Sequence, residues 1–63
     1  MLSKAGEIES QFKKGYLDLA DVLTVASVQC AQDEQDYEHE ESIFTFDDYS
    51  VLVVDNHSVE EMH

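Results

Sequence analysis

Carboxylate side chains are the groups in this sequence most able to do chemistry, and they gather between residues 33 and 48. Six of the nine residues in segment 33–41 are acidic. Alternate carboxylates lie about 6.6 Å apart along an extended chain, or about 5 to 6 Å apart at their Cβ atoms along a helix face. Lysine and arginine side chains that follow DNA phosphates accept either spacing. The segment therefore predicts a contact surface made of Glu34, Asp36, Glu38, Glu40, Glu41, Ser42, Asp47 and Asp48.

The charge of the whole chain indicates what kind of partner this surface would meet. Fifteen acids stand against three lysines, giving a formal charge of −12. All three bases (Lys4, Lys13 and Lys14) lie in the first 14 residues, so the 13 acids after Gly15 share their segment with no base. Such a field repels nucleic acid and anionic lipid and attracts cationic surfaces. We expect a basic nucleic-acid-binding protein as partner, and neither nucleic acid nor a membrane.

The distribution of cysteine and apolar residues favours the cytoplasm. Cys30 is the single cysteine, so no internal disulfide can form, whereas small secreted domains usually carry several. Polar residues occur throughout segment 1–15, unlike the uninterrupted apolar stretch of a secretory leader. The longest apolar-rich segment, 16–31, is interrupted by Asp18 and Asp21 and is no membrane span.

Catalytic and metal-binding motifs are weak. Cys30, His39, His57 and His63 have no zinc-site spacing, and segment 33–41 lacks the central glycine of a calcium loop. Asp47-Asp48 is explained by turn formation. The two glycines, Gly6 and Gly15, cannot form a phosphate-binding loop. We therefore expect no enzyme activity, no cofactor and no specific metal site.

The periodicity of apolar residues predicts a single α+β domain over residues 1–63. Ser3 is a candidate N-cap for a first helix over 3–14, which ends before Gly15. A second helix is expected over 16–34, with apolar residues on one stripe. An acidic connector over 33–41, helical or extended, follows. Residues 56–63 carry weak structural signals.

An antiparallel β-hairpin is expected after the connector. The runs 42–46 and 49–54 are rich in β-branched and aromatic residues and flank Asp47-Asp48. A two-residue loop would place five residues on the face that covers the helices: Phe44, Phe46, Tyr49, Val51 and Val53. The opposite face would carry Ile43, Thr45, Ser50, Leu52 and Val54. A longer type I turn with a bulge is the alternative. Two open strand edges favour partner binding, a homodimer or a short extra strand.

The segment Glu40-Glu41-Ser42-Ile43-Phe44 resembles the phage-encoded uracil-DNA glycosylase inhibitors. In these small, very acidic DNA mimics a Glu-Ser-Ile segment opens the first β-strand and enters the DNA-binding cleft of the enzyme. The resemblance implies that Glu41 and Ser42 contact the cleft, that Glu40 supports them and that Ile43 begins the sheet. The family also captures an apolar side chain of the enzyme in a pocket, for which the candidates here are Leu52, Val54, Val22 and Leu23.

The sequence thus predicts an inhibitory DNA mimic that blocks a nucleic-acid enzyme, with uracil-DNA glycosylase as the first candidate. An anti-restriction or anti-CRISPR inhibitor, acting on a nuclease or a CRISPR effector, is an alternative with the same charge. A second class is an adaptor or antitoxin-like protein that binds through the hairpin edge and the face formed by Ile43, Leu52 and Val54.

Overall fold

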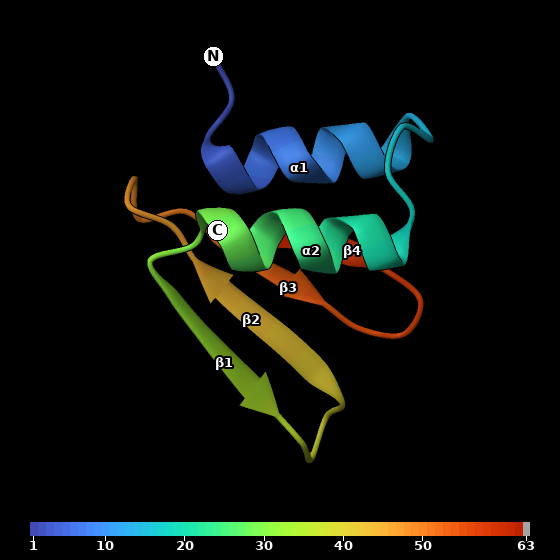
Figure 1. The fold of residues 1–63 in the computed structure, drawn as a ribbon, viewed down its shortest axis with the longest axis vertical. Coiled ribbons are helices and arrows are strands. Elements are labelled where there is room, and N and C mark those ends of the chain that lie inside the picture. Colours follow the sequence, from blue (N-terminus) through green and yellow to red (C-terminus); the bar gives the residue numbers. More distant parts are fainter. Residues whose placement is uncertain (63) are drawn as a thin grey trace.

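The computed structural model describes residues 1–62 as two helices followed by a four-stranded antiparallel sheet, an α+β fold (Figure 1). The strands follow one another in the order β1-β2-β3-β4. No helix in residues 1–62 is long and apolar enough to cross a membrane. The elements are α1 (Lys4–Lys13), α2 (Leu19–Gln29), β1 (Gln32–Asp36), β2 (Glu41–Thr45), β3 (Val51–Val54) and β4 (Val59–Met62).

Local capping sets the bounds of both helices. The Ser3 hydroxyl accepts the Gly6 backbone N–H at 3.0 Å and begins α1, and Gly15 follows this helix with a φ of 83°. The carboxylate of Asp18 accepts the N–H of Asp21 at 2.8 Å, in a reciprocal capping box. The second helix therefore begins at Leu19 and ends at Gln29, because Cys30 is extended. The expected range of 16–34 was too long at both ends.

The acidic segment forms part of the sheet rather than a connector. Residues 32–36 make β1, which pairs with β2 in a register that sets Asp36 opposite Glu41. A turn over 37–40 joins the strands, and Glu40 adopts a left-handed φ of 56° there. Like charges repel less along an exposed edge strand than in a packed interior, so β1 tolerates its acids.

Five residues lie between β2 and β3, and Phe46 and Ser50 pair to close a three-residue loop of Asp47, Asp48 and Tyr49. The N–H of Phe46 bonds to the carbonyl of Ser50 at 2.9 Å, and Tyr49 has a φ of 68°. This arrangement sets Phe44 opposite Leu52, not opposite Val51 as the two-residue loop required. A shift of one residue reverses the faces of a strand.

The predicted faces of the hairpin were therefore right for its first strand and wrong for its second. Phe44 and Phe46 are buried on the inner face as expected, but Leu52 and Val54 join them there. Val51 and Val53 lie on the outer face instead. The Tyr49 side chain is exposed.

The C-terminal segment forms a short extra strand, one of the three alternatives expected for the open hairpin edges, although the sequence did not locate it in residues 56–63. The Asp55 carboxylate accepts the N–H groups of His57 at 2.7 Å and Ser58 at 2.6 Å, which turns the chain back. β4 then pairs with β3, setting Val59 opposite Val54. His63 lies outside the described residues.

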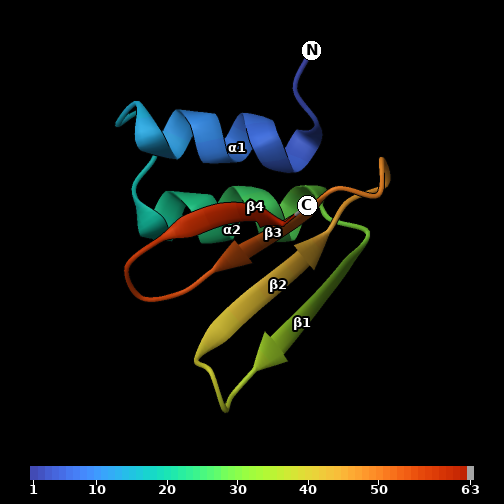
Figure 2. The ribbon, with the colours of Figure 1, turned by 180° about the vertical axis from the view of Figure 1, so that it is seen from behind.

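One thin core holds the domain together. α2 lies over one face of the sheet, α1 lies beside α2 along the β4 edge and packs against β3 and β4, and the opposite face is open (Figure 2). The buried apolar side chains are Ala5, Ile8, Val22, Ala26, Phe44, Phe46, Leu52, Val54 and Val59. A chain of this length buries only about 60% of its unfolded surface, so each of these residues contributes a large share of the stability.

Truncating Leu52 should therefore unfold much of the population. Leu52→Ala removes a fully buried side chain, and we expect a loss of about 2 to 5 kcal/mol in the free energy of unfolding, measured by urea denaturation. The matched control is Leu23→Ala in α2, where the side chain is 39% exposed and the loss should be much smaller. A greater loss of unfolding free energy for Val53→Ala than for Leu52→Ala would show that the hairpin has the two-residue register instead.

Candidate partner-binding site

The β1–β2 hairpin carries the acidic residues beyond the two helices, and its turn lies at the far end of the molecule (Figure 1). Asp36 and Glu41 are directly paired at the end of the ladder, next to this turn. Glu38 and Glu40 lie within the turn and are exposed. We call residues 34–42 the acidic hairpin. It unites six of the predicted contact residues: Glu34, Asp36, Glu38, Glu40, Glu41 and Ser42.

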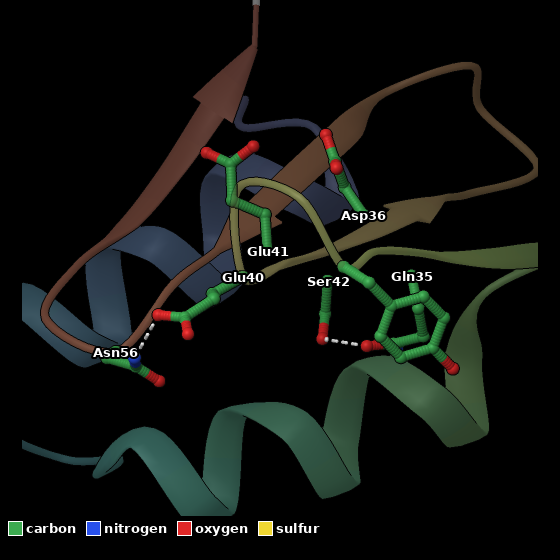
Figure 3. Close-up of a pocket in the computed structure, with 7 residues that line it drawn as sticks. Gln35, Asp36, Glu40, Glu41, Ser42 and Asn56 are labelled. Carbon is green, nitrogen blue, oxygen red and sulfur yellow. Dashed lines mark hydrogen bonds between the residues drawn. The ribbon is translucent and has the colours of Figure 1, made fainter.

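Strand alternation divides these side chains between two faces. Phe44 points to the core, so Ser42, two residues earlier, lies on the inner face with its partner Gln35. The Ser42 hydroxyl donates to Oε1 of Gln35 at 3.0 Å (Figure 3). Glu34, Asp36, Glu41 and Ile43 consequently lie on the outer, uncovered face.

A hydrogen-bonded pair orders the turn. Nδ1 of His39 lies 2.8 Å from Oδ2 of Asp36, and the His39 backbone N–H donates to Oδ1 at 3.2 Å. These bonds to His39 lower the pKa of Asp36, and the bond to Asp36 raises the pKa of His39. The proton that His39 can carry is thus stabilised by the acids around it.

The same pair belongs to a group that could share a cation. Ligand atoms of Asp36, His39 and Glu41 all lie within 4.8 Å of one another. Imidazole and carboxylate groups suit several divalent metals. His39 is exposed and its Nδ1 is already bonded to Asp36, so the arrangement is explained by the ordered turn alone.

A shallow depression of about 430 Å³ lies at this end of the hairpin (Figure 3). The amide of Asn56, from the β3–β4 loop, donates to the carboxylate of Glu40 at 3.4 Å. Asn56 was not among the predicted contact residues, because the sequence did not show where an extra strand would lie or that its loop would reach this place. The depression is lined by Gln35, Asp36, Tyr37, Glu40, Glu41, Ser42 and Asn56.

Asp47 and Asp48 do not belong to this surface. They lie at the opposite end of β2, whose five residues span about 17 Å. The Asp47 carboxylate pairs with Nζ of Lys4 at 2.6 Å, and the Asp48 carboxylate accepts the Lys4 backbone N–H at 2.8 Å. Both aspartates therefore hold the start of α1 against the β2–β3 loop, which is a structural role.

Two apolar residues also leave the predicted site. Leu52 and Val54 were expected on an exposed face, but both are buried in the core. They pair with Phe44 and Ser42 on the inner face. Of the three predicted apolar contacts, Ile43 alone lies on the outer face, where it is half-buried.

The lysines lie away from the acidic hairpin. Lys4 is paired with Asp47, and Lys13 lies 3.7 Å from Glu9 within α1. Among residues 1–62, His39 is the one basic side chain within ion-pair distance of an acid of the hairpin.

Cys30 has a local structural partner. Its thiol lies 3.5 Å from the carbonyl of Ser27 at the end of α2, and the residue is half-buried and free. Ser42 donates to an amide oxygen rather than to a base. Neither contact activates a nucleophile in the way that a neighbouring imidazole would.

The Asp48 contacts predict an acid-sensitive step in stability. Hydrogen bonds from Ser50, followed by that from the Lys4 N–H, lower the pKa of Asp48 from 3.8 to about 2. A depressed folded-state pKa adds stability above the unfolded pKa, and this stability is lost as the pH falls through the folded value. In urea titrations, Asp48→Asn should flatten the fall between pH 4 and 2, and Ser50→Ala should raise the Asp48 pKa seen by NMR. An unchanged acid slope in Asp48→Asn would contradict this.

The Glu41-Ser42-Ile43 segment opens β2, the second strand of the sheet rather than the first. Ile43 therefore does not begin the sheet, as the resemblance implied, because β1 precedes it. The side chains of the segment alternate between the outer and inner faces of the acidic hairpin. No family model, curated protein or solved structure matches this chain.

Proposed function

We propose that this protein is a non-catalytic inhibitor that imitates DNA and occupies the basic cleft of a nucleic-acid enzyme. The observation that carries the proposal is the acidic hairpin, which projects beyond the helices and has no lysine within ion-pair distance among residues 1–62. A protein that only needed solubility would gain from acids spread over its surface. Here five of the 15 acids lie within the nine residues of one projecting element.

The geometry of the hairpin supports this function. Glu34 and Asp36 lie on the same face two residues apart, about 6.6 Å along the strand. Glu41, opposite Asp36, adds a third carboxylate from the neighbouring strand. Three anionic groups close together on a narrow element suit a groove lined with lysine and arginine. We infer a partner in the cytoplasm, where a free cysteine such as Cys30 is stable.

Uracil-DNA glycosylase is the first candidate enzyme. The support is the resemblance of Glu41-Ser42-Ile43 to the segment that opens the first strand of its phage inhibitors. Here that segment stands at the start of β2, next to the acidic turn. Nucleases and CRISPR effectors have similarly basic clefts and are the next candidates.

The adaptor hypothesis loses part of its basis. It required an exposed apolar face containing Leu52 and Val54, and both are buried. An interaction through the apolar face would also weaken little with salt, whereas a contact between acids and a basic cleft weakens steeply.

Neutralising the acidic hairpin should abolish binding and leave the fold intact. The triple variant Glu38→Gln, Glu40→Gln, Glu41→Gln removes three carboxylates without changing size. We expect its melting temperature to stay the same or rise, since repulsion is relieved. Affinity for the partner enzyme, measured by calorimetry at low salt, should be lost. Unchanged affinity would remove this surface from the proposal.

The glycosylase assignment is tested directly by uracil excision. A near-equimolar amount of this protein should stop excision, because a mimic in the DNA cleft competes with every substrate. Glu41→Lys should lose inhibition, whereas Glu7→Lys, the same change on the exposed side of α1, should keep it. Normal excision with the protein in excess at low salt would exclude this enzyme, and the same assay with nucleases and CRISPR effectors would then follow.

A further inference from the structure

The two edges of the sheet differ. The order β1-β2-β3-β4 leaves β1 and β4 as edge strands. α1 packs along β4, and the Glu61 backbone N–H donates to the Glu9 carboxylate at 2.8 Å. Beyond β1, Figures 1 and 2 show no further element of the described chain. One edge is thus protected by a helix, and the other is open.

The hydrogen bonds of the sheet identify which backbone groups are open on β1. Phe46 bonds across to Ser50, so alternation directs the backbone groups of Phe44 and Ser42 toward β3. The alternate residues of β2, which are Thr45, Ile43 and Glu41, then bond toward β1. Their partners there are Gln32, Glu34 and Asp36. The N–H and C=O groups of Asp33 and Gln35 consequently point away from the sheet.

The side chains along this edge restrict what can pair with it. Three of the five residues of β1 are acidic. A second copy of β1 would bring carboxylates against carboxylates, which destabilises a cross-strand pair. A hollow of about 510 Å³ lies beside the strand, where Glu34 and Gln32 stand next to Ile43 and Thr45. Such a site suits a lysine or arginine, whose stem is apolar and whose end is cationic.

We propose that β1 is a docking edge that takes a β-strand of the partner protein, with lysine or arginine at alternate positions. The strand would bond to the open backbone groups of Asp33 and Gln35 and set its cations beside Glu34 and Asp36. This mode is β-strand addition, in which main-chain bonds give affinity and alternate side chains give specificity. The inference rests on the proposed function, because it concerns the same basic partner.

The test uses a synthetic full-length chain and a defined probe, a short capped peptide of alternating lysine and valine. Binding is followed by NMR at low salt. Bound peptide should slow hydrogen exchange at the Asp33 and Gln35 amides. N-methylation of the Gln35 amide should weaken binding by about tenfold or more, since a strand bond is lost and the edge is obstructed. N-methylation of the Leu2 amide, ahead of α1, is the matched control and should change nothing.

A second peptide separates strand pairing from charge attraction. Its valines are N-methylated, so it keeps every lysine but cannot pair as a strand, and we expect it to bind at least about tenfold more weakly. Equal binding of the two peptides, absence of binding, or unchanged exchange at Asp33 and Gln35 would each overturn the docking edge.

The proposed function fails separately. Suppose that an enzyme inhibited by this protein still binds the N-methyl-Gln35 protein but does not bind the triple glutamine variant. That result would support the DNA-mimic proposal and exclude the docking edge. If the enzyme binds the triple variant as tightly as the parent protein, the DNA-mimic proposal itself falls.

Discussion

The contact between the inner face of the sheet and the two helices is the interaction on which the rest of this structure depends. Phe44 and Leu52 lie opposite each other there, and Val22 and Ala26 of α2 are buried in the same core. Because side chains alternate along a strand, burying Phe44 also fixes the direction of its neighbours. Ile43 and Glu41 must face outward and Ser42 inward. The geometry of the candidate site thus follows from the core.

Charge imposes the second constraint, because few cations are present to offset the carboxylates. Lys4 and Lys13 are the end residues of α1, and they pair with Asp47 and Glu9 rather than with the acids of the hairpin. The acids left on the β1–β2 hairpin repel one another, and this repulsion is least costly where water surrounds them. A projecting edge hairpin meets that condition. The location where the acids destabilise the fold least is therefore also the one that presents them most openly to a partner.

The sequence was sufficient for the two helices and the α+β class, because helical periodicity and caps such as Ser3 are local signals. It could not decide the hairpin register, since both alternating sets of β3, Val51 with Val53 and Leu52 with Val54, are apolar. The left-handed Tyr49 in the loop decided it. β1 was missed because an edge strand exposed on both faces has no hydrophobic alternation. The sequence showed the cluster of acids over 33–41 but not its place in a hairpin, and tertiary contacts were needed to show that Asp47 and Asp48 lie against the start of α1.

The proposed interaction would relieve a charge repulsion that the fold of the free protein retains. Carboxylates packed as closely as Asp36 and Glu41 weaken the free protein, because like charges directly opposite each other on paired strands repel. A cationic partner removes that repulsion when it binds, so part of its binding free energy is relief of strain already present in the free state. Since such a ligand binds the folded chain and not the unfolded one, it also stabilises a domain with a small core. Affinity and stability are therefore both expected to rise from the same contact.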